Sequence, residues 1–139
     1  TDSFTSEPEE IEFELEKDEN HWRWRLRMAR RISQEMSRQM QGVKATYIFG
    51  STRNRTAGPG SDINIIVHFQ GDPVQKATLE SWLHGWSLCL AEINYLRTGK
   101  KNPEGLLDVH FVSDKEIEDG KGMARKINAV TDSARLLPT

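Results

Sequence analysis

Two acidic residues and one amide suggest the chemistry in this sequence. Asp62 and Asn64 stand two residues apart at the start of an apolar run, and Asp108 stands inside another, Leu106–Val112. Residues two apart in a strand point to the same face, so Asp62 and Asn64 share a face opposite Ile63. Carboxylate and amide oxygens are ligands that Mg²⁺ accepts. If the two strands are neighbours, the sequence predicts a magnesium site formed by Asp62, Asn64 and Asp108.

Each acidic residue also has a plainer interpretation, which the sequence leaves open. Asp62 would then cap a loop, and Asp108 would form an isolated ion pair, because a carboxylate in an apolar strand is costly without a partner or a metal. His68 and His110 lie on the acid-bearing faces of the same two strands. They are either a proton shuttle or a phosphate contact, or else hydrogen-bonded strand histidines.

A glycine-rich loop precedes the first of these strands, with the sequence GSTRNRTAGPGS over residues 50–61. A glycine lets the backbone approach a ligand closely, and N–H groups at the start of a helical turn favour an anion. Arginine side chains pair with phosphate oxygens. The loop therefore predicts a phosphate site, with an ordinary strand connection as the alternative. Its candidate contacts are Gly50, Ser51, Arg53, Arg55 and Ser61.

The surrounding pattern predicts the elements that position these residues. A helix capped by Asp18 or Asn20 runs to about residue 40, and a long helix covers residues 74 to about 97. Strands cover residues 43–49, 62–69 and 106–112, and two short helical pieces follow near 114–129 and 131–137. The predicted fold is α+β, in the order α-β-β-α-β-α, with helices packed on a short mixed sheet.

Two apolar stripes indicate the faces of the helices that form the core. The first helix repeats apolar residues about every four positions, and its arginines are expected on a solvated face, with phosphate contact as the alternative. The long helix has eight apolar residues at helical spacing, which we expect to be buried, the lone cysteine included. These are Leu79, Trp82, Leu83, Trp86, Cys89, Leu90, Ile93 and Leu96.

Charge divides the chain of 139 residues into two parts. Residues 1–20 contain nine acidic residues and one lysine, a formal charge of −8, whereas the remaining residues sum to +6. We expect residues 1–17 to be an acidic arm or linker and residues 18–139 to form one domain. A basic body favours an anionic partner. A single cysteine and the lack of a long apolar run predict a cytoplasmic protein without a membrane partner.

The order of these motifs resembles the nucleotidyltransferase superfamily related to DNA polymerase beta. The shared pattern is a hydrophobic-Gly-Ser turn at Gly50-Ser51, then Asp-x-(Asp/Glu) at residues 62–64, then a lone acid at Asp108, and it covers roughly residues 22–115. Residues 61–71, 82–90, 94–101 and 106–114 further resemble small nucleotidyltransferase domains. Those domains accompany bacterial proteins of the pyruvate phosphate dikinase and PEP synthase type.

The resemblance implies a reaction and assigns roles to the candidate residues. Gly50 and Ser51 would hold a nucleoside triphosphate, ATP first among them, and Asp62 and position 64 would hold catalytic Mg²⁺. Asp108 would be the third acid, which activates a hydroxyl acceptor for transfer of the nucleotidyl group. The sequence departs from the family at Asn64, where the family has an acid. Because an amide carries no negative charge, we expect weakened metal binding and turnover.

Two other functions fit the same residues. A non-catalytic module could sense nucleotide at Gly50-Ser51 and regulate an attached domain, and Asn64 favours this alternative. An antitoxin-like protein could instead bind a partner through its arginine-rich helix. In every case the acceptor or partner, whether a domain or another protein, is not identified by the sequence, and nucleic acid ranks below the other ligands because no sequence-reading element stands out.

Overall fold

The computed structural model describes residues 20–127 and 133–139. The expected acidic arm over residues 1–17, the capping role of Asp18 and parts of the two C-terminal helical predictions lie outside these residues. Within the described part of the chain, no helix is both long enough and apolar enough to span a membrane.

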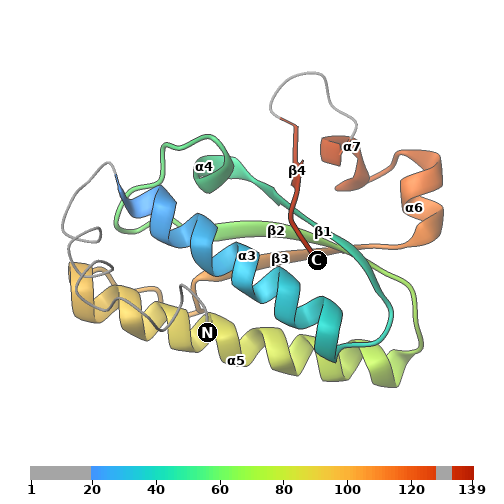
Figure 1. Cartoon of the computed structure of the whole chain (residues 1–139), viewed down its shortest axis with the longest axis horizontal. Helices are drawn as coiled ribbons and strands as arrows, with labels where there is room; N and C mark the ends of the chain where they lie inside the picture. The colour runs from blue at the N-terminus through green and yellow to red at the C-terminus, as the bar shows by residue number, and fades with distance from the viewer. Residues whose placement is uncertain (1–19, 128–132) are drawn as a thin grey trace.

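A four-stranded mixed sheet forms the centre of the fold (Figure 1). Its strands are β1 (Val43–Phe49), β2 (Ile63–Phe69), β3 (Leu107–Val112) and β4 (Arg135–Leu136), in the spatial order β3-β2-β1-β4. β2 pairs antiparallel with β1 and parallel with β3, and β4 pairs antiparallel with β1. The predicted α+β class and mixed sheet are thus confirmed, and the three predicted strands agree with the structure to within one residue at each end.

Two long helices cover one face of the sheet, α3 (His21–Gln39) and α5 (Pro73–Thr98) (Figure 1). Their buried apolar residues pack with Ile48, Ile63, Ile65 and Val67 in one core. The sequence fixes the start of α5 through a capping box: Asp72 Oδ1 accepts from Gln75 N at 2.7 Å, and Gln75 Oε1 accepts from Asp72 N at 3.0 Å.

Shorter elements lie at the ends of the sheet and on its second face. α4 (Gly50–Arg53) follows β1 directly, and α6 (Asp114–Asp119) and α7 (Ala124–Ile127) follow β3. A smaller apolar cluster joins α7 to this second face through Ile66, Val112, Ala124 and Ala134. This cluster covers the second face around Ile66 and Val112, and Asn64 and Asp108 lie nearer the start of the same two strands.

The structure corrects two predictions about the helices. The stretch predicted as helical near 131–137 contains β4, because Leu136 and Arg135 pair with Tyr47 and Ile48 of β1. Cys89 is exposed, and Leu96 is 70% exposed, so neither belongs to the core. These two residues are seven apart on α5, so they lie on the same side of the helix, and the sheet does not cover that side. The stripe of apolar residues on α5 is therefore wider than the face of the helix that is buried.

The pairing of β4 predicts different effects of substitution at two adjacent leucines. Leu137 is 3% exposed, and its backbone N donates to Thr46 O at 2.8 Å, whereas Leu136 is 61% exposed. We expect Leu137→Ala to lower the free energy of unfolding by about 2–4 kcal/mol. The matched control Leu136→Ala should change it by less than about 0.5 kcal/mol. Urea denaturation measures both, and equal losses would contradict the position of the C-terminal strand.

Candidate active site

The register of two parallel strands brings the predicted metal ligands together. Asn64 of β2 is the direct neighbour of Asp108 of β3. Both side chains point away from α3 and α5, because the alternate residues Ile63 and Ile65 are buried in the core beneath the helices. Asp62 immediately precedes β2 and is exposed. The condition on which the predicted site depended, that the two strands are neighbours, is met.

Gly50 shapes the floor of this site. Its φ is +75°, and a Cβ atom at this position would lie 2.5 Å from the side-chain amide nitrogen of Asn64. The positive φ and the close approach both require glycine here. Gly50 O accepts from Asn54 N at 2.9 Å, and Ser51 O accepts from Thr56 N at 2.8 Å, which closes the turn after α4. Gly50 thus lies beside Asn64, and nucleotide binding at Gly50-Ser51 stays a prediction.

The other predicted phosphate contacts have structural partners. Arg53 Nε donates to Ser133 O at 3.2 Å, and the Arg55 guanidinium lies 5.0 Å from the ring centre of Trp22. Ser61 Oγ accepts from Gly58 N at 2.9 Å and closes the turn before Asp62. These contacts fix the loop, and a direct role of the three side chains in phosphate binding stays a prediction.

A buried arginine that the sequence analysis did not single out anchors the same loop. Arg25 of α3 is fully buried. Its Nε donates to Ser61 O at 2.9 Å, and one terminal nitrogen donates to Pro59 O at 3.1 Å and to Asn94 Oδ1 at 3.0 Å. Helical spacing could have predicted its burial. Arg25 precedes the buried Met28 by three residues and therefore lies on the apolar face of the helix.

Two asparagines complete this anchor. Asn94 of α5 is fully buried, and its Nδ2 donates to Pro59 O at 2.8 Å. Asn102, from the loop after α5, donates its Nδ2 to Gly60 O at 3.3 Å and accepts from Asn94 Nδ2 at 3.3 Å. Three successive carbonyls, those of residues 59 to 61, are therefore held by side chains from α3, from α5 and from the loop after α5.

Asp62, Asn64 and Asp108 form what we call the acidic cluster. The charges around it favour a cation. Although Asp62 is exposed as a residue, its carboxyl is partly shielded from solvent, and this desolvation is the first cause that raises its pKa. The negative charge of Asp108 raises the pKa further, while Arg25 opposes the shift. Burial lowers the pKa of Arg25 to about 10, so this side chain remains charged at neutral pH. A divalent cation would relieve the repulsion between the two carboxylates.

The donor set nevertheless differs from a complete acidic site. Two carboxylates and one amide oxygen are hard donors of the kind that Mg²⁺ accepts. However, the described residues contain no group of three or more His, Cys, Asp or Glu side chains that could hold a metal. Asn64 stands at the position where the Asp-x-(Asp/Glu) pattern has its second acid. The cluster thus offers two carboxylates and one amide oxygen to a cation, one negative charge fewer than three acids would supply, and metal binding stays a prediction.

The two strand histidines have different surroundings. His110 Nε2 lies 3.2 Å from Asp108 Oδ2, and the His110 ring centre lies 5.8 Å from that of Phe49. His68 Nε2 lies 2.6 Å from Asp114 Oδ1, at the start of α6. His110 is thus part of the candidate site through its contact with Asp108. His68 fits the interpretation of a hydrogen-bonded strand histidine.

Comparison with known proteins identifies the family. The model of the family described as "Nucleotidyltransferase domain" matches residues 29–133, which include every residue of the acidic cluster. The chain belongs to the nucleotidyltransferase domain family.

A solved structure gives a further comparison. A protein from Sulfolobus solfataricus, provisionally assigned as a nucleotidyltransferase and determined at 1.40 Å resolution, is 18% identical in sequence. The similarity covers 83% of this chain and 80% of that one, with a TM-score of 0.47. The comparison with curated proteins finds no match.

The close approach of Gly50 to Asn64 generates the first prediction for the nucleotidyltransferase site. Gly50→Ala should lower the free energy of unfolding by about 1–3 kcal/mol, because alanine is strained at positive φ and its methyl group displaces the Asn64 amide. Gly60→Ala is the matched control in the same loop, since no atom lies within 4 Å of its added methyl group. Urea denaturation measures both variants. Equal stability of the two would show that Gly50 is not constrained.

The raised pKa of Asp62 generates a prediction about pH. A carboxyl whose pKa is raised by folding destabilises the fold above its folded pKa, and this cost disappears below the unfolded value of 3.8. Asp62→Asn should therefore raise Tm by about 1–3 °C near neutral pH, a small effect because solvent screens the group. The difference should vanish as the pH falls toward 3.8.

Thermal unfolding followed by circular dichroism across this pH range tests the effect. Glu118→Gln, at an exposed position on α6, controls for the loss of one negative charge elsewhere. A lower Tm for Asp62→Asn at neutral pH would mean that Asp62 stabilises the fold, contrary to the analysis.

Proposed function

We propose that this domain binds Mg²⁺ and a nucleoside triphosphate, ATP first among them, and transfers the nucleotidyl group to a hydroxyl acceptor. We further propose that Asn64 makes this transfer slow. The observation that carries the proposal is the juxtaposition of Asn64 with Asp108 across β2 and β3, with Asp62 close enough for its pKa to respond to the charge of Asp108.

The proposed cation would be held by the carboxylates of Asp62 and Asp108 and by the amide oxygen of Asn64. When bound, Mg²⁺ supplies charge that offsets the triphosphate and polarises the phosphoryl group. Asn64 keeps an oxygen donor but loses a negative charge, and an amide bridges two cations poorly. The chain is therefore expected to retain nucleotide affinity better than catalytic rate.

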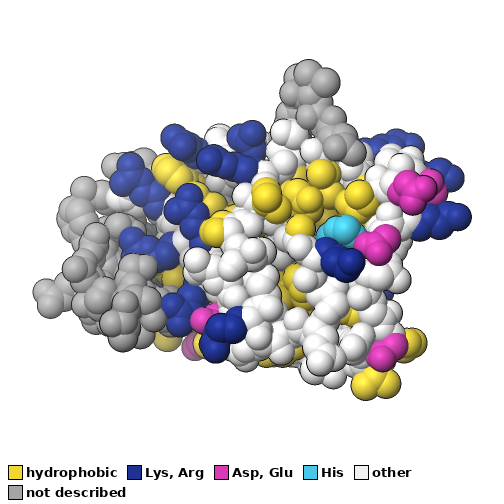
Figure 2. Space-filling model, turned by 45° about the vertical axis from the view of Figure 1, so that its right-hand side comes forward, with side chains coloured by type: hydrophobic (Ala, Val, Ile, Leu, Met, Phe, Trp, Pro, Cys, Tyr) yellow, Lys and Arg dark blue, Asp and Glu magenta, His cyan; other side chains and the backbone are white. Residues whose placement is uncertain are grey.

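The protein's own residues would position the triphosphate. The backbone turn at Gly50-Ser51 lies against Asn64, so a phosphate bound there would lie beside the metal ligands. The rest of the surface suits an anion, since residues 21–139 have a formal charge of +6. Figure 2 shows Lys and Arg side chains outnumbering Asp and Glu on the visible face.

Asp108 is the proposed proton acceptor for the attacking hydroxyl. Its side chain is 49% exposed, so an acceptor molecule has access to it. The contact between Asp108 Oδ2 and His110 Nε2, at 3.2 Å, constrains the orientation of the carboxylate. General-base catalysis of this kind typically contributes 10²–10⁴-fold to a rate.

A second function, nucleotide sensing without catalysis, is favoured by one specific observation. The missing third acidic ligand at Asn64 reduces the negative charge that metal-assisted transfer uses. The turn at Gly50-Ser51 would still bind a triphosphate. In this case the domain would report nucleotide concentration to whatever domain or protein it contacts.

Restoring the acid distinguishes the two functions. Asn64→Asp should bind Mg²⁺-ATP about 10–100-fold more tightly than the unsubstituted chain, because it adds a negative charge to the cation site. The gain should disappear with EDTA. Isothermal titration calorimetry measures binding, and incorporation of label from α-³²P-ATP into acceptors measures transfer, which we expect to appear or increase in the Asp variant.

Two further variants make this test specific. Asn64→Ala controls for loss of the amide and should bind Mg²⁺-ATP no better than the unsubstituted chain. Adding Asp108→Asn to Asn64→Asp should remove the regained transfer while leaving the fold intact. Nucleotide binding that is equal in all forms and independent of metal would exclude the catalytic proposal and leave the sensing function.

A further inference from the structure

Two exposed arginines lie against one tryptophan at the start of α3. The guanidinium carbon of Arg23 lies 5.4 Å from the ring centre of Trp22, and that of Arg55 lies 5.0 Å from the same centre. Arg55 has a φ of +61°, the only positive φ of a residue other than glycine in the part of the chain that the structure describes. Such a backbone is strained for an L side chain. The indole thus gathers two cations from segments that are about thirty residues apart in the sequence.

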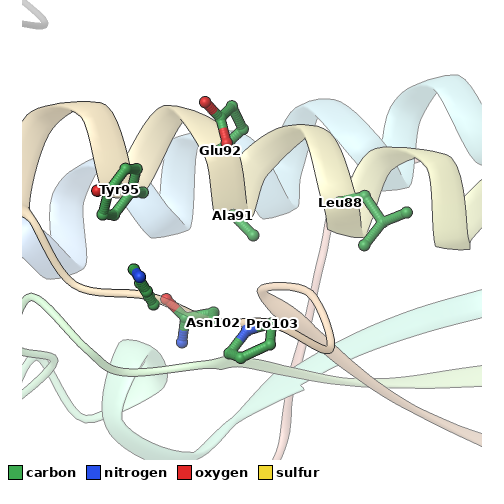
Figure 3. Close-up of a pocket in the computed structure, with 7 residues that line it drawn as sticks. Leu88, Ala91, Glu92, Tyr95, Asn102 and Pro103 are labelled. Carbon is green, nitrogen blue, oxygen red and sulfur yellow. The ribbon is translucent and has the colours of Figure 1, made fainter.

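The end of α5 adds positive charge to the same end of the molecule. Arg25, near the start of α3, donates to Asn94 Oδ1 near the end of α5 at 3.0 Å. The loop after α5 then turns back, and Figure 3 shows its residues Asn102 and Pro103 facing the helix. Residues 93–107 contain three basic residues and one acidic residue, Glu104. The exposed basic residues of these joined segments, which we call the basic end, are Arg23, Arg55, Arg97, Lys100 and Lys101.

The most acidic stretch of the chain is attached at this basic end. Residues 1–19, which we call the acidic segment, contain nine acidic residues and one lysine, a formal charge of −8. Only Asn20 separates them from His21, where α3 begins. An extended chain spans about 3.4 Å per residue, so Glu16 can reach about 17 Å from the start of the helix. Attachment through a short linker gives an effective concentration in the millimolar range.

We propose that the acidic segment binds to the basic end of its own chain and competes there with the triphosphate. Its carboxylates would pair with Arg23 and Arg55 beside Trp22. Exposed ion pairs contribute little individually, so the contact depends on several pairs and on the high local concentration of the attached segment. A free anion must overcome that concentration to displace it.

The competition follows from the position of one side chain. Arg55 is a candidate phosphate contact, and its backbone N donates to Thr52 O at 3.3 Å in the turn that begins at Gly50. A carboxylate on Arg55 would occupy a cation that the triphosphate uses. This competition rests on the proposed function, whereas binding of the acidic segment to the basic end does not.

NMR of the whole 139-residue chain tests the contact without nucleotide. The variant replaces six glutamates by glutamine and changes the formal charge of the acidic segment from −8 to −2, at Glu7, Glu9, Glu10, Glu12, Glu14 and Glu16. At low salt, the indole signal of Trp22 and the amide signal of Arg55 should differ between the two chains. The difference should disappear near 1 M salt, where the Debye length is about 3 Å. Identical signals at low salt would overturn the contact.

Matched variants at exposed positions make the NMR test specific. Glu118→Gln with Asp119→Asn removes two negative charges from α6 and should leave the Trp22 signal unchanged. Arg23→Gln should shift the amide signals of residues 10–19. Lys44→Gln, which removes one exposed charge from β1, should not shift them. Equal effects of the two single variants would overturn the assignment of the basic end.

Calorimetric titration with Mg²⁺-ATP tests the competition. The chain with six glutamines should bind Mg²⁺-ATP at least about fivefold more tightly than the unsubstituted chain, and the α6 double variant should not. Equal affinities of the unsubstituted chain and the chain with six glutamines would overturn the competition. Absence of binding in both would overturn the proposed function and the competition with it, while the NMR result would still decide whether the acidic segment binds to the basic end.

Discussion

The buried guanidinium of Arg25 is the interaction on which the candidate site depends. Removing a charge from water costs several kcal/mol unless hydrogen bonds replace the lost solvation. Arg25 regains them from Ser61 O, Pro59 O and Asn94 Oδ1, and from His21 O one turn back in its own helix. The loop over residues 58–62 has no regular secondary structure, so these bonds determine its path. They also determine where Asp62 emerges in front of β2.

The same loop places the carboxylate of Asp62 near that of Asp108, where its negative charge does not stabilise the fold. Burial and the charge of Asp108 both raise the pKa of Asp62, so ionised Asp62 costs stability. Positive φ at Gly50 and at Arg55 adds backbone conformations that side chains disfavour. Repulsion and strain of this kind gather where a protein binds a ligand rather than where it needs only to fold. The deep core under α3 and α5 supplies the stability that tolerates them.

Sequence periodicity could predict the parts of the site that depend on local geometry. Alternation along β2 and β3 placed Asp62, Asn64 and Asp108 on the face opposite the core, and the structure agrees. The buried position of Arg25 was not predicted, because an arginine in a charged helix is expected at the surface. Its hydrogen-bond partners in the loop and in α5 are 34 to 69 residues away in the sequence. The strand β4 was not predicted, because a strand of two residues is too short to show an alternating pattern. Both depend on long-range contacts that no local pattern encodes.

The amide of Asn64 affects the stability of the fold and the chemistry of the site in opposite directions. A carboxylate at this position would stand beside Asp108 and near Asp62, and three negative charges would raise the electrostatic cost of the empty site. An amide keeps the shape of the acid and its contact with Gly50 without adding that cost. The chain can therefore keep its turn, strand register and anchored loop without a bound cation. Under the proposed function, the loss would fall on the interaction with a cation, on which metal-assisted nucleotidyl transfer depends.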